Sequence, residues 1–277
     1  MKIVNSGSDR SFVIFKDRVI LIDPNRESLE RYIKVSDFLN KRRINVPKIY
    51  KVFPNFVIIR NLGKSLYSEL KSGRKTDRWL ESRYYKIINE LVKFHSIPLK
   101  NVEIFSSFDL KVLTWEWRYF IENYLLNYLG VKNIDRWFLF SDIVINVCYN
   151  VYRSFSNLIH RDLQSTNVIF FRGVPYFIDF QGMMVGNFLY DLASLLEDPY
   201  INLPFYLKEK LLVSYFRNSG WDWSLFSVYR YYKIQRLVQV LGAFAFLSLH
   251  KNKDFFIVHL KNSEMVFRNI IEEIKKL

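Results

Sequence analysis

The chain has 277 residues, of which 50% are hydrophobic and 18% aromatic, and its formal net charge is +14 at pH 7. This length and apolar content exclude a disordered chain and favour one two-lobed enzyme or two small domains. The single cysteine excludes an internal disulfide. The basic residues are spread along the chain rather than clustered, so we expect no nucleic acid among its partners.

The sequence carries no pattern typical of a membrane span or an export signal. Its longest apolar stretch runs only from Leu237 to Leu249, whereas a transmembrane helix needs about 20 residues. Residues 1–5 lack an apolar signal region and lead directly into a strand-like pattern. We therefore expect a cytoplasmic protein with no membrane partner. Its oligomeric state, monomer or homodimer, is left open.

Residues 1–62 are predicted to form a small antiparallel sheet that carries one helix. β-Branched and aromatic runs bounded by polar turns indicate four strands, over 11–15, 19–22, 49–52 and 56–59. Between the second and third strands, apolar residues recur at helical spacing over 27–42. This segment is the expected N-terminal, nucleotide-binding lobe.

Residues 63–277 are predicted to form a larger, mainly helical lobe that binds the substrate and carries the catalytic residues. Apolar residues three or four positions apart indicate helices over 79–95, 110–129, 141–155 and 206–217. One interruption is expected to be a β-hairpin, with strands at 167–171 and 175–178 and a turn at Arg172-Gly173-Val174. The predicted fold class is therefore α+β.

Polar residues that suit phosphoryl transfer lie at both ends of this hairpin. Asp162 and Asn167 have the spacing of the kinase pattern H-R-D-x-x-x-x-N, in which the aspartate is the base and the asparagine holds a metal ion. Asp179 ends the returning strand, opposite Asn167, where it can chelate the same ion. Each residue alone could simply cap a turn. In this order around a hairpin, they predict a kinase that uses Mg²⁺ or Mn²⁺.

The sequence resembles the aminoglycoside-phosphotransferase and choline-kinase superfamily, and within it the bacterial cell-wall sugar kinases that act on N-acetylmuramate and N-acetylglucosamine. The segments that carry the resemblance are Val19–Pro24, His160–Asn167, Ile178–Gly182, Tyr190–Tyr200 and Gln235–Ala243. The resemblance implies a bilobal, protein-kinase-like fold and ATP or GTP as the phosphoryl donor. It also implies that Asp162 is the catalytic base and that Asn167 and Asp179 are metal ligands.

The resemblance implies supporting roles for two further residues near the catalytic loop. Asp191 would be a buried carboxylate that braces this loop, although an aspartate before Leu192 is also a favoured helix N-cap. His160 is expected to be a hydrogen-bonded brace without a catalytic role.

Two segments are expected to contact the nucleotide. One is a short loop whose backbone N–H groups would reach phosphate oxygens, with an ordinary hairpin turn as the alternative. The other is the hinge between the lobes, whose backbone would pair with the adenine edge. The residues concerned are Ser6, Gly7, Ser8, Arg60, Asn61 and Leu62.

The sequence departs from the protein-kinase pattern at the third strand. That strand would carry a lysine for the nucleotide phosphates, but it ends here in Ile22 and Asp23. Lys16, Arg18 and Arg10 are the neighbouring cations that could replace the lysine, and each of them could equally be an exposed hairpin charge.

The predicted acceptor is an N-acetylated amino sugar, phosphorylated at its anomeric hydroxyl, as the resemblance implies. From residue 191 onward Lys and Arg outnumber Asp and Glu, which disfavours a polycationic aminoglycoside. The alternatives left open are an aminoglycoside, choline bound in an aromatic cage, another small alcohol, and an inactive kinase fold that only binds. The polar residues expected near the sugar are Gln164, Gln181, Gln235 and Arg236, and a structural role is favoured for Gln235 and Arg236, which are expected to lie on a helix.

Overall fold

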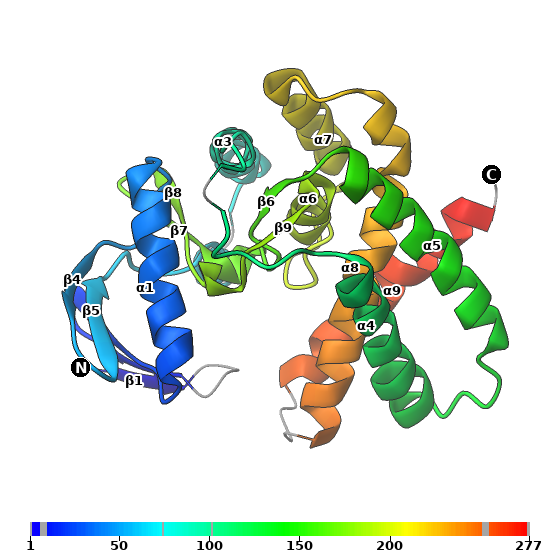
Figure 1. Cartoon of the computed structure of the whole chain (residues 1–277), viewed down its shortest axis with the longest axis horizontal. Coiled ribbons are helices and arrows are strands. Elements are labelled where there is room, and N and C mark those ends of the chain that lie inside the picture. Colours follow the sequence, from blue (N-terminus) through cyan, green and yellow to red (C-terminus); the bar gives the residue numbers. More distant parts are fainter. Residues whose placement is uncertain (1, 6–9, 74, 101, 251–254, 276–277) are drawn as a thin grey trace. The chain divides into compact units, whose positions relative to one another are not determined.

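The computed structural model describes residues 2–5, 10–73, 75–100, 102–250 and 255–275, and these fold into two compact units (Figure 1). Unit 1 contains residues 1–97 and 162–183, and unit 2 contains residues 98–161 and 184–277. Each unit is thus built from two separate stretches of the chain. The lobe boundary expected after residue 62 does not coincide with this division and stays a prediction.

Unit 1 contains a five-stranded antiparallel sheet with the strand order β1-β2-β3-β5-β4. Its strands are β1 (Lys2–Asn5), β2 (Ser11–Ile14), β3 (Arg18–Ile22), β4 (Ile49–Val52) and β5 (Phe56–Arg60). In the central pair, Arg18 lies opposite Arg60 and Ile22 opposite Phe56. The four strands predicted from the sequence are therefore confirmed to within a residue or two.

Helix α1 (Arg26–Lys41) lies across one face of this sheet (Figure 1). It begins after Asn25, whose side-chain oxygen accepts a hydrogen bond from the Ser28 N–H at 3.0 Å. Its apolar stripe, which includes Leu29 and Val35, is buried. The predicted helix over 27–42 is confirmed.

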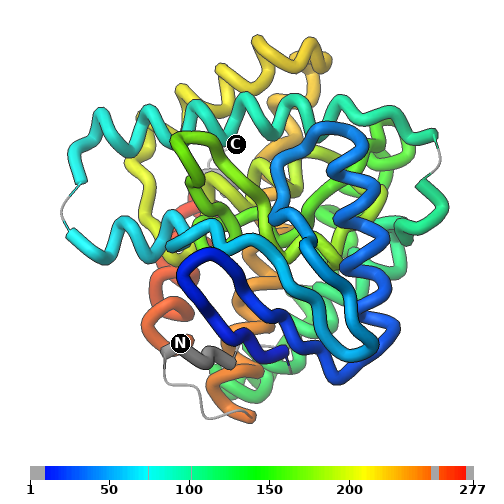
Figure 2. The backbone as a smooth tube through the Cα atoms, turned by 90° about the vertical axis from the view of Figure 1, so that its left-hand side faces the viewer, coloured from blue at the N-terminus to red at the C-terminus, as the bar shows by residue number. Residues whose placement is uncertain are grey.

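The second stretch of unit 1 adds a hairpin to the first. Strands β7 (Val168–Phe171) and β8 (Val174–Phe177) pair directly, as the sequence predicts. The Phe177 N–H donates to the Asn45 carbonyl at 2.9 Å, so the hairpin lies beside the end of α1 (Figure 2). Helices α2 (Leu66–Lys71) and α3 (Asp77–His95) complete the unit.

Unit 2 is mainly helical and is organised around the long helix α8 (Ser224–His250). Around it pack α4 (Leu110–Phe120), α5 (Asp135–Ser154), α6 (Phe188–Leu196) and α9 (Phe255–Lys275). Helix α7 (Phe205–Ser219) and a two-stranded ribbon of β6 (Asn157–Ile159) and β9 (Met184–Gly186) complete the unit. The sequence did not reveal this ribbon.

The helix predicted over 110–129 changes geometry part of the way along. It is α-helical to Phe120 and π-helical over Ile121–Tyr128. Gly242 of α8 approaches this junction so closely that a Cβ atom on it would lie 3.0 Å from the Phe120 nitrogen. Glycine at this position lets the two helix backbones pack together.

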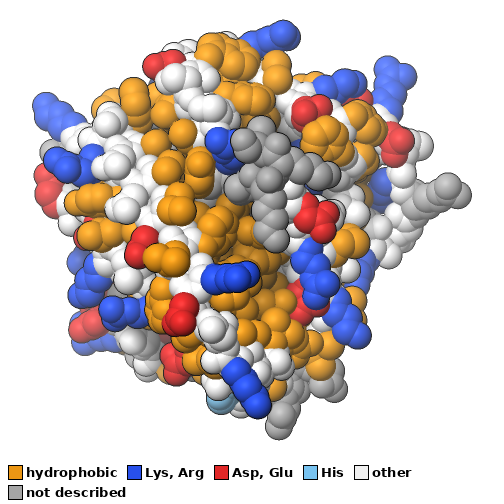
Figure 3. Space-filling view, turned by 90° about the vertical axis from the view of Figure 1, so that its right-hand side faces the viewer, with side chains coloured by type: hydrophobic (Ala, Val, Ile, Leu, Met, Phe, Trp, Pro, Cys, Tyr) orange, Lys and Arg blue, Asp and Glu red, His pale blue; other side chains and the backbone are white. Residues whose placement is uncertain are grey.

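The surface of unit 2 is partly apolar. The face in Figure 3 carries hydrophobic side chains interspersed with Lys and Arg. Phe138, Leu139 and Ile143, all on α5, are among the exposed large hydrophobic residues. None of the helices in the described part of the chain combines the length and the apolar composition of a membrane span.

Candidate active site

The loop before β7 brings the predicted base and the predicted metal-binding asparagine together. The Asn167 side-chain Nδ2 donates to the Asp162 backbone carbonyl at 2.8 Å, and the Gln164 N–H donates to the same carbonyl at 3.0 Å. A single 3₁₀ turn, Ser165–Asn167, then leads into the strand. The kinase-like spacing therefore folds into a tight, self-bonded loop.

Asp179 returns to this loop at the base of the hairpin. The N–H of the preceding residue, Ile178, donates to the Asn167 carbonyl at 3.0 Å, so Asp179 directly follows the last link between the two strands. Its backbone is left-handed, with φ 63°, a conformation that few residues other than glycine adopt. The side chain of Asp179 is 52% exposed, and its Oδ1 accepts a hydrogen bond from Gln181 Nε2 at 2.5 Å.

Helix α1 holds the segment after Asp179 in place. The Arg31 guanidinium donates to the carbonyls of Gln181 at 2.6 Å and Met183 at 2.9 Å. Tyr32 stacks on Phe180 with ring centroids 4.8 Å apart. Arg31 could not be identified from the sequence, because its partners are backbone carbonyls about 150 residues further along the chain.

The donor set in this region fits Mg²⁺. The side-chain amide of Asn167 has one donor, Nδ2, and one acceptor, Oδ1. Because Nδ2 donates to the Asp162 carbonyl, Oδ1 is the atom that could bind a cation. Asp179 adds carboxylate oxygens. Among the described residues no group of three or more His, Cys, Asp or Glu that could hold a metal is found. A Mg²⁺ site does not require such a group, because Mg²⁺ commonly binds through one or two protein oxygens together with nucleotide phosphates and water.

Asp191 braces the chain that leads into the catalytic loop. Its carboxylate, which is fully buried in α6, accepts hydrogen bonds from the backbone N–H groups of His160 at 2.6 Å and Arg161 at 2.8 Å. Ser194, one turn later, donates to the Arg161 carbonyl at 3.1 Å. The cap of α6 is Asn187, so the alternative that Asp191 is the N-cap is wrong.

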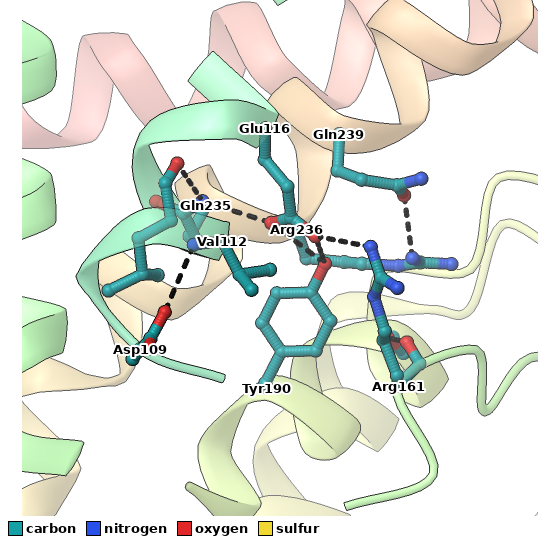
Figure 4. Close-up of polar contacts among 10 residues, drawn as sticks. Asp109, Val112, Glu116, Arg161, Tyr190, Gln235, Arg236 and Gln239 are labelled. Carbon is teal, nitrogen blue, oxygen red and sulfur yellow. Dashed lines mark hydrogen bonds and ion pairs between the residues drawn. The ribbon is translucent and has the colours of Figure 1, made fainter. Parts of the chain in front are cut away.

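A second buried carboxylate, Glu116 of α4, binds the side chain of Arg161 (Figure 4). Arg161 Nη2 lies 3.3 Å from Glu116 Oε1. The same carboxylate accepts hydrogen bonds from the Tyr190 hydroxyl at 3.0 and 3.1 Å and from Gln235 Nε2 at 3.0 Å. Burial raises the pKa of Glu116 above its ordinary value, although Arg161 and these hydrogen bonds oppose the shift. The residue before Asp162 is thus fixed through both its backbone and its side chain.

Glu116 could not be identified from a sequence motif. Its partners lie 45 to 119 residues further along the chain, so no local motif contains them. The one feature of the sequence that could have pointed to Glu116 is its place within the apolar α4 segment, because a charged side chain that is buried there needs a partner. Arg161 itself has φ 75°, so the constraints hold it in a backbone conformation that is unfavourable for a side chain of its size.

Of the residues predicted near the sugar, two belong to the interior of unit 2. Gln235 bridges Glu116 and the indole N–H of Trp117, which matches the structural role expected for it. Arg236 is buried, donates to Gln239 at 2.7 Å and lies over the Tyr190 ring. A role for Arg236 in substrate binding stays a prediction. Gln164 and Gln181 lie in unit 1 with Asp162 and Asp179.

The residues predicted to contact the nucleotide fall into two groups. Ser6, Gly7 and Ser8 lie outside the described residues. In the predicted hinge, Arg60 donates to the Tyr50 hydroxyl, and Asn61 donates to the Phe15 carbonyl at 2.6 Å. Leu62 is buried. These contacts fix residues 60–62 within unit 1. A hinge at this place, and the pairing of its backbone with adenine, stay predictions.

Two sequence relatives share most of this chain. The N-acetylmuramate/N-acetylglucosamine kinase of Neisseria meningitidis serogroup B is 25% identical over 262 residues, which cover 89% of this chain and 75% of that protein. The kinase of the same description from Pseudomonas putida is 24% identical over 204 residues. That match covers 72% of this chain and 56% of the relative, so the chain spans little more than half the length of this second protein.

Solved structures with the same fold cover nearly the whole chain. An ethanolamine kinase from Plasmodium vivax has a TM-score of 0.67 at 19% identity and covers 97% of this chain and 83% of its own. The ADP-bound aminoglycoside phosphotransferase APH(2'')-Ib has a TM-score of 0.63 at 16% identity, with coverages of 95% and 90%. The GDP complex of aminoglycoside 2'-phosphotransferase-IIIa has a TM-score of 0.67 at 16% identity, with coverages of 97% and 92%. These similarities confirm the kinase-like α+β fold.

The family described as the phosphotransferase enzyme family matches residues 1–228, which include the whole of unit 1 and the catalytic loop. The motif residues, the fold and this match agree. The chain therefore belongs to the phosphotransferase enzyme family and is a kinase.

Proposed function

We propose that this kinase transfers the γ-phosphoryl group of ATP or GTP to the anomeric hydroxyl of an N-acetylated amino sugar. The observation that carries the proposal is the clustering of Asp162, Asn167 and Asp179 at the base of one hairpin. Asn167 is the centre of this cluster, because its side chain donates to the Asp162 carbonyl and its own carbonyl accepts from Ile178, the residue before Asp179. An oxygen-rich cluster of this kind suits a hydroxyl acceptor and a metal-bound triphosphate.

In the proposed reaction, Asp162 is the base and orients the acceptor. Its carboxylate takes the proton of the acceptor hydroxyl while that oxygen bonds to the γ-phosphorus and the bond between this phosphorus and the β-phosphate oxygen breaks. Asn167 and Asp179 would supply the oxygens that hold Mg²⁺, and the ion would offset the negative charge of the phosphates. Asp191 and Glu116 hold the chain before Asp162, so that the base keeps its position.

Two considerations support an amino sugar as the acceptor. The two sequence relatives are described as N-acetylmuramate/N-acetylglucosamine kinases. In addition, an anomeric hydroxyl is more acidic than other sugar hydroxyls, which leaves less proton-transfer work for a carboxylate base. Gln164 and Gln181 are the proposed sugar contacts, since amides both donate to and accept from hydroxyl and acetamido groups.

The test is a comparison of acceptors with purified protein and radiolabelled ATP or GTP. N-acetylglucosamine and N-acetylmuramate are compared with their methyl glycosides, in which the anomeric oxygen is blocked and the other hydroxyls are intact. We expect phosphorylation of the free sugars and none of the glycosides. Equal rates for both would contradict anomeric transfer. If ethanolamine, choline or an aminoglycoside in the same panel were phosphorylated faster than the amino sugars, that compound would be identified as the acceptor instead.

A further inference from the structure

We infer that Arg10 is the cation that contacts the nucleotide phosphates in place of the missing lysine of β3. This inference rests on the proposed use of ATP or GTP, but not on the identity of the acceptor. The sequence offered three candidates for this role, and the structure gives them different environments. Lys16 is exposed, and Arg18 is 54% exposed and paired with its neighbour Asp17. Arg10 is buried, with a side chain that is 7% exposed.

Arg10 is held between the end of β3 and the first turn of α1. Its Nε donates to Asp23 Oδ2 at 2.6 Å, and its Nη2 donates to Ser28 Oγ at 2.7 Å. The pKa of Asp23 reflects this contact. Burial raises this pKa, but hydrogen bonds from Arg10 and Ser28 and from the backbone N–H of Asn25 hold it below its ordinary value. Asp23 is therefore a carboxylate that fixes a buried guanidinium in one orientation.

The orientation directs Arg10 toward the predicted metal ligand. Arg10 Nη1 lies 3.7 Å from Asp179 Oδ1, which is the distance of an ion pair rather than of a hydrogen bond. Phosphate oxygens bound to an ion on Asp179 would lie within a few ångströms of that ion, and hence within reach of Nη1. The planar guanidinium suits phosphate because it can donate two parallel hydrogen bonds.

The arrangement also explains why Ile22 and Asp23 stand at the end of β3. A lysine at the end of β3 would extend from that strand. Arg10 instead extends from the residue just before β2, and its guanidinium lies near Asp179. Asp23 then supplies the negative partner that a buried cation requires.

A purely structural role would also account for the contacts of Arg10 with Asp23 and Ser28, so the test must separate the two roles. Full-length wild type, Arg10→Met, Lys16→Met and Arg18→Met are compared by calorimetry for binding of ATP with Mg²⁺, ATP with EDTA, and adenosine. Circular dichroism confirms that each variant is folded. Adenosine serves as the probe without phosphates.

We expect Arg10→Met to weaken ATP binding by about tenfold or more, with and without Mg²⁺, because hydrogen bonds to charged groups are lost. Adenosine binding should stay unchanged. The variants of Lys16 and Arg18 should bind like the wild type. A folded Arg10→Met protein with wild-type affinity for ATP, or one that loses adenosine binding equally, would overturn the inference.

A second measurement covers the case in which Arg10→Met does not fold. In wild-type protein, the ¹⁵Nε–Hε resonance of Arg10, assigned through its own backbone, should shift on addition of ATP and not of adenosine. A resonance that ATP leaves in place would overturn the inference. A wild type that binds ATP no better than adenosine would overturn both this inference and the proposed function, whereas normal ATP binding by Arg10→Met would overturn this inference alone.

Discussion

The guanidinium of Arg161 lies 3.3 Å from the carboxylate of Glu116, a residue with no exposed surface in the interior of unit 2. Arg161 immediately precedes the predicted base. Its backbone N–H is fixed by Asp191, and its side chain is fixed by Glu116. The residue before Asp162 is therefore fixed by two buried carboxylates from two different helices.

The first prediction concerns turnover in a Glu116→Gln variant. The amide keeps the size of the side chain but loses the charge that attracts Arg161, so the loop before Asp162 should hold the base less firmly. We expect kcat to fall by roughly tenfold to a hundredfold, since small displacements of a catalytic group have effects of this size. The KM for nucleotide should change by less than about twofold. Steady-state kinetics measures both, and Glu122→Gln, an exposed neighbour, is the control. An unchanged kcat would contradict the positioning role.

The second prediction uses the raised pKa of Glu116. A carboxyl group whose pKa is higher in the folded than in the unfolded state stabilises the fold when protonated, and this contribution is lost as the pH rises from the unfolded pKa through the folded one. The free energy of unfolding of the wild type, relative to Glu116→Gln, should therefore fall as the pH rises above 4.5 and then level off. Urea unfolding at a series of pH values measures this difference. A difference that increases with pH would mean that Arg161 outweighs burial.

The third prediction is that Asp162→Asn removes the base and leaves the fold intact. Turnover should fall by about a hundredfold to ten-thousandfold, the usual contribution of a general base. Nucleotide affinity should survive, because the substituted atom is not a proposed metal ligand. Single-turnover kinetics and equilibrium binding give the two quantities, with the exposed Asp37→Asn as the matched control. Wild-type turnover in Asp162→Asn would remove Asp162 from the mechanism.

The fourth prediction concerns the metal. Asn167→Ala and Asp179→Ala should each weaken ATP binding in the presence of Mg²⁺, because each removes an oxygen ligand. In EDTA, the two variants and the wild type should bind ATP with similar affinity. Titration of each protein with ATP in both buffers makes this comparison. A loss of affinity that is equally large in EDTA would indicate a role in folding or direct phosphate contact rather than in holding the ion.

The sequence predicted those parts of the fold and the site that depend on short stretches of chain. The hairpin around residues 167–178 and the strands of unit 1 follow from local alternation of apolar residues and from turn signals. The proximity of Asn167 and Asp179 could be predicted because hairpin pairing makes it a consequence of sequence spacing, while the roles of Asp162, Asn167 and Asp179 stay predictions. The four predicted strands and the helix over 27–42 differ from the structure only at their ends.

Long-range contacts could not be predicted in this way. Glu116 and Arg31 act on partners that are far away along the chain, and their contacts depend on how helices pack. The choice of Arg10 over Lys16 and Arg18 depended on burial, which single residues do not reveal. The role of Asp191 became clear only because the structure assigns the cap of α6 to Asn187.

Because unit 1 is built from two separate stretches of chain, its first stretch is synthesised well before the second stretch that completes it. Residues 1–97 leave the ribosome first, but the hairpin that bonds to Asn45 and the segment that binds Arg31 belong to residues 162–183. At about 5 to 20 residues per second, synthesis of the chain from residue 98 to residue 183 takes roughly 4 to 17 s. During this interval the nascent sheet and α1 lack the backbone and side-chain partners that complete their packing. We therefore expect chaperones that bind exposed apolar surface to bind the growing polypeptide. For the same reason, a fragment that ends at residue 97 should be prone to aggregation.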